Sequence, residues 1–228
     1  MQKTAIPLSK RYLGDEVSNV IKEQIFNLQY HRGERLIVES LASQLGVSMT
    51  PVREGLKLLV GQGIVVYDGK SYAVFNPSRK EIQDIFSIRR YLEKLSAFAA
   101  TERLTAEKLD ALYTLQYHWG EQSDVDLRQF IAFDIEFHTL LAKSSENERL
   151  LLMSLPINEQ CHLLRLWSYE HNFPKENLAK TVEEHISILD AMKIGDAKKA
   201  EQLMDKHLLK GEQIAWKMYD NFYSEVKV

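Results

Sequence analysis

The segment that most constrains the fold is residues 39–62, in which two helical patterns meet at a glycine. The first pattern places three apolar side chains on one face of a helix: Leu41, Ala42 and Leu45. Gly46 then permits a tight turn, and a second helix is predicted from Ser48 or Thr50 to about Gln62. Two short helices joined in this way form a helix-turn-helix, a unit that places the start of its second helix in the major groove of DNA.

The sequence on either side of this segment supplies the other parts of a winged helix. Before it, apolar residues recur at helical spacing from Val17 to Leu28. After it, the β-rich runs IVVY and SYAVF flank residues 68–70 (DGK), which predicts a hairpin. We therefore predict a winged helix-turn-helix domain over residues 1–76. A structural three-helix domain with an incidental hairpin is the alternative that these residues leave open.

Beyond a linker at residues 76–78 (NPS), no strand pattern is found, and the chain is predicted to be helical to its end. The helices are expected at six ranges: 79–101, 105–122, 124–144, 147–171, 175–194 and 197–222. Pro156 is expected to kink or interrupt the fourth helix, because proline lacks the amide that a helix interior needs. Six helices of this length form a bundle. Residues 77–228 are therefore predicted to be an all-α domain, and the whole chain a mainly α protein.

Charge and composition narrow the class of protein further. The net charge is −3, but residues 1–78 carry +2 and residues 79–228 carry −5, which fits contact with phosphate at one end only. No run approaches the roughly 20 apolar residues of a membrane-spanning helix, and the first residues lack the apolar core of a signal peptide. The single cysteine, Cys161, cannot form an intramolecular disulfide and is expected to be a core thiol. We therefore expect a cytoplasmic protein with no membrane partner.

The run LASQLGVSMTPVREGLKLLVGQGIV resembles the signature of the GntR superfamily of bacterial regulators, and its TPVRE core is specific to that pattern. The resemblance implies a homodimer that binds a palindromic operator in double-stranded DNA through its winged helices. It assigns contact with DNA to six positions: Glu39, Ser48, Met49, Thr50, Arg53 and Gly69. Two positions depart from the family pattern, because Met49 stands where arginine is usual and Ser71 where a wing glycine is common. The missing cation predicts a lower affinity and a slightly smaller salt dependence of DNA binding.

The helical half contains one local pattern with metal-ligand chemistry, the sequence DIEFH. Asp134 and His138 are four residues apart in it, so both project from one face of a helix. His185 and His207 lie on two later predicted helices. Three imidazoles and one carboxylate that converge inside a bundle would suit Zn²⁺, Ni²⁺ or another borderline divalent ion. From the residues alone, a core or solvated Asp–His pair is the commoner interpretation of this spacing.

Residues 79–222 resemble the FCD effector domain, the branch named after the fatty-acid regulator of the same superfamily. This resemblance implies a divalent metal at the base of a cavity for a small organic acid, held by four side chains: Asp134, His138, His185 and His207. It also places Arg89 where it can bind a carboxylate in bidentate fashion. Arg90 is expected to be a solvated surface charge, and Arg165 to form an ion pair with a nearby glutamate. Three other histidines match no ligand position: His118, His162 and His171.

These features predict a regulator of transcription whose affinity for its operator changes when a small carboxylate binds near the metal. Two alternatives stay open. In the first, the metal ion itself is the signal. In the second, an ion with open coordination positions activates water in a metallohydrolase. The sequence offers little for this second alternative, since it has no H-E-x-x-H motif, no recognisable Ser/His/Asp set and no phosphate loop.

Overall fold

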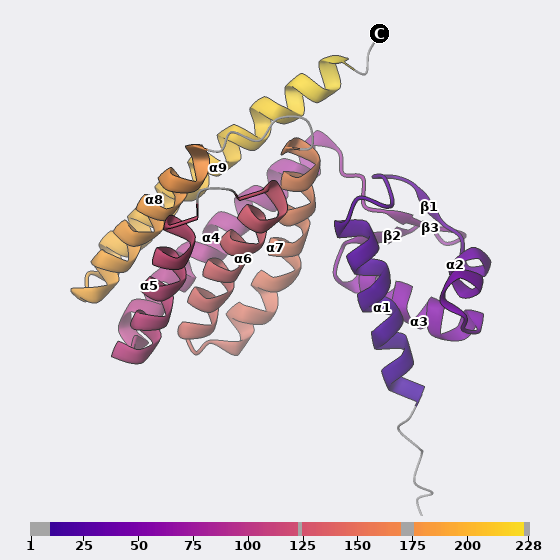
Figure 1. The fold of residues 1–228 in the computed structure, drawn as a ribbon, viewed down its shortest axis with the longest axis horizontal. Coiled ribbons are helices and arrows are strands. Elements are labelled where there is room, and N and C mark those ends of the chain that lie inside the picture. Colours follow the sequence, from indigo (N-terminus) through magenta and orange to yellow (C-terminus); the bar gives the residue numbers. More distant parts are fainter. Residues whose placement is uncertain (1–9, 123–124, 170–175, 226–228) are drawn as a thin grey trace, which may run out of the picture. The chain divides into compact units, whose positions relative to one another are not determined.

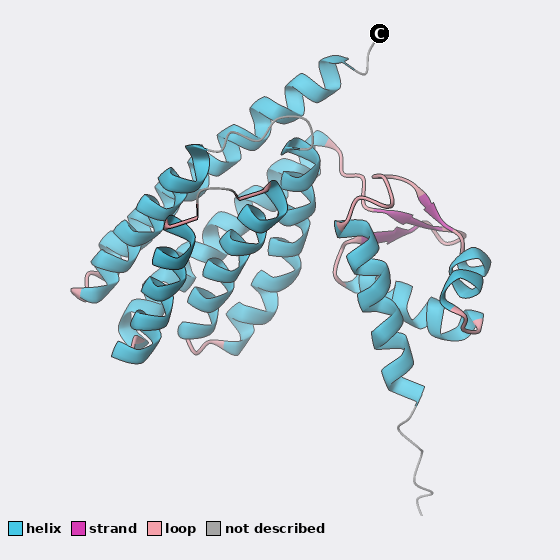
Figure 2. Ribbon diagram, in the orientation of Figure 1, coloured by secondary structure: helices cyan, strands magenta, loops and turns pink. Residues whose placement is uncertain are grey.

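The structure is a computed structural model that describes residues 10–122, 125–169 and 176–225. The chain divides into two compact units, Met1–Ser78 and Arg79–Val228. Most of the described chain is helical (Figures 1 and 2), so the mainly α fold expected from the sequence is confirmed. None of the helices in these described ranges is both long and apolar enough to span a membrane.

The N-terminal unit combines three helices with a small antiparallel sheet. In chain order its elements are α1 (Lys10–Phe26), β1 (Arg35–Leu36), α2 (Val38–Leu45), α3 (Met49–Gly61), β2 (Val65–Tyr67) and β3 (Tyr72–Val74). The strand order is β1-β3-β2, and β2 and β3 form the expected hairpin, with Val65 opposite Val74 and Tyr67 opposite Tyr72. The sequence does not predict β1, because two residues are too few to show an alternating pattern.

The turn between α2 and α3 and the packing of α1 on α3 define the helical part of this unit. Gly46 follows α2 with a φ of 66°, a left-handed conformation that favours glycine, and its amide donates to the Ala42 carbonyl. α1 approaches α3 closely at Gly55, where an added Cβ would lie 2.9 Å from the Ser18 amide nitrogen. The side chains buried in this unit include an apolar set from all three helices: Val17, Ile21, Ile25, Leu41, Val52, Leu56 and Leu59.

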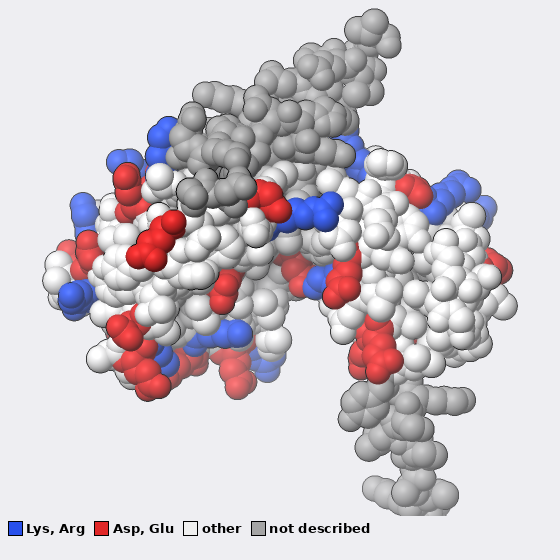
Figure 3. Space-filling view, in the orientation of Figure 1, with Lys and Arg blue, Asp and Glu red and all other residues white. Residues whose placement is uncertain are grey.

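The C-terminal unit is a bundle of helices (Figure 1). In chain order they are α4 (Arg79–Arg103), α5 (Ala106–Gly120), α6 (Leu127–Ser144), α7 (Glu148–Tyr169), α8 (Glu176–Lys193) and α9 (Ala197–Glu225). α7 continues through Pro156, so the helix is not interrupted there. A proline removes one intrahelical hydrogen bond, and the packing of α7 on both α4 and α6 supports the helix around it. Cationic and acidic side chains are interspersed over the visible face of this unit (Figure 3).

Polar caps begin two of these helices, and an apolar core fills the bundle. The Thr105 side chain accepts a hydrogen bond from the Lys108 amide at the start of α5, and Asp126 and Gln129 form a capping box at the start of α6. The core cluster includes side chains from five helices: Ala97, Leu112, Phe137, Leu141, Ile188, Leu189 and Met204. These contacts hold α6, α8 and α9, the helices that carry the expected metal ligands.

Candidate functional site

Four side chains with metal-ligating chemistry meet inside the helical bundle. α6 contributes Asp134 and His138, which are four residues apart on one face, α8 contributes His185, and α9 contributes His207. One ligating atom from each of them lies within 4.8 Å of those of the others. The first three residues are buried and the fourth is half-buried. The structure therefore brings together all four residues that the sequence singles out as metal ligands.

Each of the three imidazole rings has its Nδ1 beside an oxygen atom of a neighbouring helix. The pairs are His138 with the Glu93 carboxylate, His185 with Gln116 Oε1 at 3.0 Å, and His207 with Glu184 Oε2 at 2.8 Å. An oxygen acceptor at Nδ1 holds the ring proton on that atom, so Nε2 keeps its lone pair free. The rings are therefore oriented for ligation through Nε2.

The Nε2 atoms of His138 and His185 are buried and have no hydrogen-bond partner among the described residues. They lie 3.5 Å and 3.7 Å from oxygens of Asp134, which is longer than a good N–H···O hydrogen bond. A buried polar atom without a partner is costly. A cation bound by these nitrogens and by the carboxylate would remove that cost. Imidazole nitrogens with one carboxylate oxygen suit Zn²⁺ or Ni²⁺, so the residues fit a divalent ion.

The electrostatics of the cluster favour the protonation states that a metal needs. Burial lowers the pKa of His138, and burial together with the nearby His207 lowers the pKa of His185, so both rings stay neutral. Burial acts to raise the pKa of Asp134, but the nearby Arg165 outweighs it and holds that pKa well below its usual value. The cluster thus presents neutral nitrogens and an ionised oxygen near neutral pH.

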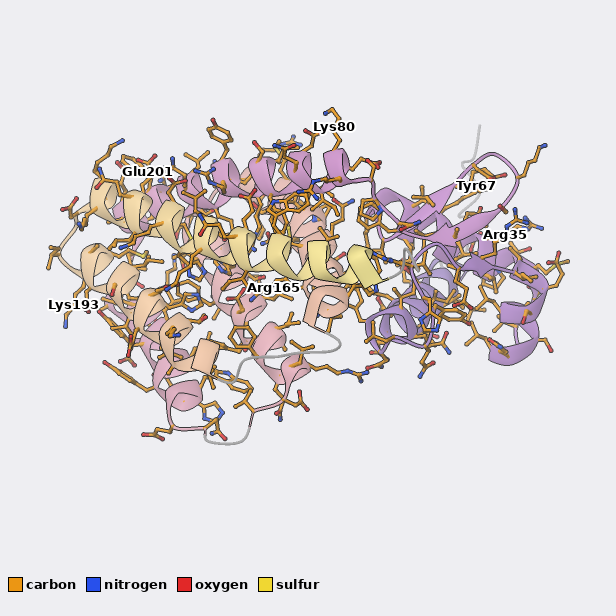
Figure 4. All side chains as sticks on the ribbon, turned by 90° about the horizontal axis from the view of Figure 1, so that it is seen from above. Arg35, Tyr67, Lys80, Arg165, Lys193 and Glu201 are labelled. Carbon is orange, nitrogen blue, oxygen red and sulfur yellow. The ribbon has the colours of Figure 1, made fainter. Side chains whose placement is uncertain are left out.

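Two arginines approach Asp134 from other helices. Arg165 of α7 pairs with its carboxylate and lies among the helices of the bundle (Figure 4). Arg89 of α4 has its Nη2 atom 3.8 Å from the same oxygen and donates to Glu93 across 2.7 Å. The expectation that Arg165 pairs with a glutamate is wrong, because α7 packs on α6 and so brings this side chain to an aspartate.

Arg90, the neighbour of the expected effector-binding arginine, is also placed differently from the expectation. It is not a solvated surface charge, since its guanidinium lies 2.8 Å from Asp205 of α9 and its side chain is half-buried. Lys94 approaches the same carboxylate at 3.6 Å. Arg90 therefore links α4 to α9, whereas Arg89 is buried beside the metal-ligand cluster.

A pocket of about 50 Å³ opens beside the cluster, a space for a few water molecules or for a carboxylate group. Its lining combines metal-ligand residues with four cationic side chains and some apolar ones: Asp134, His207, Arg89, Arg165, Lys180, Lys210, Phe130 and Ile214. One of the lysines, Lys210, pairs with Glu184, the carboxylate that also contacts the His207 ring. The pocket wall thus has an excess of positive charge beside the ligand set, which favours an anion.

The residues that orient the rings are not among those predicted from the sequence. Glu93 stands four residues after Arg89, a spacing at which two side chains meet on one helix face, so a signal exists for this ion pair. Gln116 and Glu184 carry no comparable signal. They reach the histidines only through the packing of α5 on α8 and of α8 on α9.

In the N-terminal unit, the positions expected to contact DNA lie on α2, α3 and the wing. Three of them are exposed around the start of α3: Ser48, Met49 and Thr50. Arg53 is exposed one turn later, and Glu39 is exposed in the first turn of α2. Gly69 occupies the wing turn with a φ of 92°. In the same turn the amide of Ser71, the other departure from the family pattern, donates to Asp68 across 2.7 Å.

The remaining histidines and the cysteine do not join the metal-ligand set in the described residues. His118 is exposed and meets the edge of the Trp119 ring, His162 is half-buried on α7, and His171 lies outside the described residues. Cys161 is buried, and burial raises its pKa to about 11, so it stays a neutral thiol.

The sequence matches two protein families, one in each unit. Residues 13–72 match the bacterial regulatory proteins of the gntR family, and residues 84–210 match the FCD domain family. The HTH-type transcriptional regulator YdhC of Bacillus subtilis (strain 168) is 27% identical over 195 residues, which cover 84% of each chain. These matches agree with the division of the chain into a DNA-binding part and a helical part.

Solved structures share the fold of the chain. The structure of E. coli McbR/YncC is 27% identical, has a TM-score of 0.78, and matches over 91% of this chain and 98% of that chain. The metal-free FCD domain of TM0439 is 18% identical, with a TM-score of 0.53 over 64% of this chain and 99% of that domain. The second similarity concerns the fold alone. The relatives named as regulators are not enzymes.

Proposed function

The chain belongs to the GntR family of bacterial transcriptional regulators, in the branch that carries an FCD domain, and we propose that a small carboxylate bound beside a divalent metal sets its affinity for an operator. The protein is a regulator and not an enzyme. In this proposal Asp134, His138, His185 and His207 hold the metal, and the wing and the start of α3 bind DNA.

The observation that carries this proposal is the meeting of three oriented imidazoles and a carboxylate beside a cationic pocket, whose wall includes Asp134 and His207. Four protein ligands leave coordination positions open on an ion that accepts five or six. An organic anion can fill such a position and neutralise the charge of the ion. Arg89 can then hold the anion by charge-assisted hydrogen bonds. Arg165 can do the same once the metal also binds Asp134, the carboxylate that pairs with this arginine.

The proposed assembly is a homodimer, because a palindromic operator has two equivalent halves. One face of α4 supports the proposed homodimer. Ile88, Tyr91 and Leu95 are 47%, 74% and 50% exposed and recur at intervals of three and four residues, so they form one apolar strip. A second copy of the chain, packed along this strip, would cover it and leave the inner face of α4 to the pocket.

Regulation requires that the effector favour one arrangement of the two winged helices. An effector that bound both arrangements equally would not change the affinity for DNA. The test begins with elemental analysis of the purified protein and selection of its operator from randomised duplexes. Operator affinity is then measured after chelation, after reloading with zinc or nickel, and with acetate, lactate, malate or citrate added.

We expect about one metal ion per chain, because the four ligands form a single site. His138→Ala should lose this ion, and the matched variant His118→Ala should retain it. A carboxylate should shift the operator affinity of the metal-loaded protein and not of Arg89→Ala. An operator affinity that follows free metal without any carboxylate would assign the signal to the ion. Absence of bound metal under all loading conditions would contradict the proposal.

A further inference from the structure

The base-reading end of α3 presents an apolar side chain to solvent. Met49 is the first residue of α3 and is 45% exposed. The flanking Ser48 and Thr50 are exposed too, and the Ser48 side chain makes no capping hydrogen bond to the helix. In a helix-turn-helix, the N-terminal residues of the second helix are those that contact base edges. Met49 therefore stands where a base is read.

The rest of this helix face fixes the direction from which DNA approaches. Met49, Arg53 and Lys57 follow one another at intervals of four residues, so they lie along one side of α3. Arg53 and Lys57 are exposed, and neither forms an ion pair with another described residue. Exposed cations without a protein partner are suited to phosphate.

The two cations also border a groove of about 440 Å³ between α3 and the wing. Three further residues line it: Val60, Tyr67 and Tyr72. Tyr67 projects from the sheet of this unit (Figure 4), and its ring centroid lies 4.6 Å from that of Tyr72. A sugar-phosphate backbone seated in this groove would meet Arg53 and Lys57. Met49, at the start of α3, is then turned to the bases.

The chemistry of methionine restricts which base it can meet. Its thioether has no donor and is only a weak acceptor. In the major groove, guanine, cytosine and adenine present hydrogen-bonding atoms at their edges, whereas thymine adds an apolar 5-methyl group. Against the first three bases, Met49 would displace water from polar atoms and leave them unpaired, which costs affinity. Against thymine, the methyl group and the thioether bury apolar surface together.

We infer that Met49 recognises the 5-methyl group of a thymine in each half of the operator. The inference rests on the operator-binding function proposed above and adds a determinant of operator choice to it. Arg53 and Lys57 supply affinity through phosphate, which carries no sequence information, and Met49 supplies discrimination at one base pair.

The test uses the full-length protein and the operator selected from randomised duplexes. Each thymine is replaced singly by uracil, which removes the methyl group and leaves every hydrogen-bonding atom in place. We expect one thymine in each half-site at which this change weakens binding about fourfold, the effect of one buried methyl group. Replacement in both half-sites should weaken binding by about the square of that factor, roughly fifteenfold.

Three variants of exposed residues separate base reading from general DNA affinity. Met49→Leu keeps an apolar side chain and should keep the sensitivity to the methyl group. Met49→Ala is too short for the contact and should bind the thymine and uracil operators equally. Lys57→Ala should bind both operators more weakly by the same factor, with the methyl effect unchanged, because a phosphate contact does not depend on the base.

Equal binding of the thymine and uracil operators by the unmodified protein would overturn the inference. So would a Met49→Ala variant that keeps the full methyl sensitivity, since another side chain would then make the contact. A selection that enriches no sequence would contradict operator binding itself. That failure appears before any thymine is replaced, so the two are distinguishable.

Discussion

At the scale of single residues, a histidine ligates a metal well when its second ring nitrogen is held, and Gln116 does this for His185. Gln116 is fully buried, and its Oε1 lies 3.0 Å from His185 Nδ1. The substitution Gln116→Leu keeps a buried side chain of similar size but removes the acceptor. We expect the affinity of the chain for zinc to fall about 10- to 100-fold, because the ring loses its fixed tautomer and orientation.

Competition with a chromophoric chelator measures this affinity without any need for DNA or effector. The matched control is Gln202→Leu on α9, where the glutamine is exposed and has no part in the cluster. The control should bind zinc like the unmodified protein. Unchanged zinc affinity in Gln116→Leu would show that the His185 ring is held by its other contacts, such as the stacked Phe137 ring at 3.7 Å.

In the protein without a metal ion, Arg165 neutralises the buried carboxylate of Asp134. Asp134 is 1% exposed, and its remaining cationic neighbour, Arg89, stands 3.8 Å away. Loss of one partner from a buried ion pair costs about 3 kcal/mol. We therefore expect Arg165→Met to lower the free energy of unfolding by about this amount in the presence of a chelator.

Zinc should restore most of that stability, because the ion takes over the neutralisation of Asp134. Urea denaturation with chelator and with excess zinc measures the two differences. The control is Arg149→Met, an exposed arginine on the same helix, which should behave like the unmodified protein in both conditions. A loss of stability in Arg165→Met that is the same with and without zinc would mean that the arginine acts through packing alone.

At the scale of elements, the contact between α1 and α3 depends on a glycine. A Cβ added at Gly55 would lie 2.9 Å from the Ser18 amide nitrogen and 3.0 Å from the Gly14 carbonyl oxygen. Backbone atoms cannot turn aside as a flexible side chain can, so the helices must separate. We expect Gly55→Ala to destabilise the N-terminal unit by about 1–3 kcal/mol, the usual cost of overpacking.

A second glycine of the same helix provides the control. A Cβ at Gly61 would meet no atom within 4 Å, so Gly61→Ala should be neutral or stabilise α3 by up to about 1 kcal/mol through helix propensity. The tryptophans all lie after residue 78, so their fluorescence reports the helical unit, whereas circular dichroism reports both units. Gly55→Ala should lower the midpoint temperature of the unfolding transition that circular dichroism detects and tryptophan fluorescence does not. An unaltered transition would refute the close approach of α1 and α3.

The helices of the chain could be predicted because their signals are local. The periodicity of apolar residues marks helices such as α1, and caps such as Thr105 and the left-handed Gly195 mark helix ends. The strand β1 could not be predicted, because its two residues form a strand only by pairing with β3. Pro156 shows the opposite case, in which tertiary packing keeps a helix continuous across a residue that interrupts helices in isolation.

The candidate site was predictable to the extent that its pattern lies on one element. Asp134 and His138 share a face of α6 through their spacing alone, whereas the choice of His185 and His207 needed the family resemblance. The oxygens that orient the rings come from other helices, and their pairing depends on how these helices pack. For the same reason, no local spacing could show that Arg165 meets an aspartate of α6 rather than a glutamate near its own position.

At the scale of the whole molecule, α4 lies at both the proposed effector site and the proposed dimer interface of the helical unit. Its inner face carries Arg89 and Glu93, which are buried beside the metal-ligand cluster. Its outer face carries Ile88, Tyr91 and Leu95, the apolar strip proposed as the dimer interface. An anion that draws Arg89 toward the pocket would therefore act on the helix that, in the proposed dimer, also contacts the second copy. This gives the effector a direct physical route to the arrangement of the dimer.

The strip on α4 can be tested by placing a charge in it. Leu95→Glu adds a carboxylate to a face that the second copy would bury, where an unpaired charge is costly, so the dimer should dissociate. Light scattering should give half the mass of the unmodified protein. Operator affinity should fall about 100-fold or more, because the two half-sites are no longer bound together. The matched control is Ile194→Glu, an exposed apolar residue directly after α8, which should stay dimeric. A Leu95→Glu protein that keeps the dimer mass and the operator affinity would place the interface elsewhere.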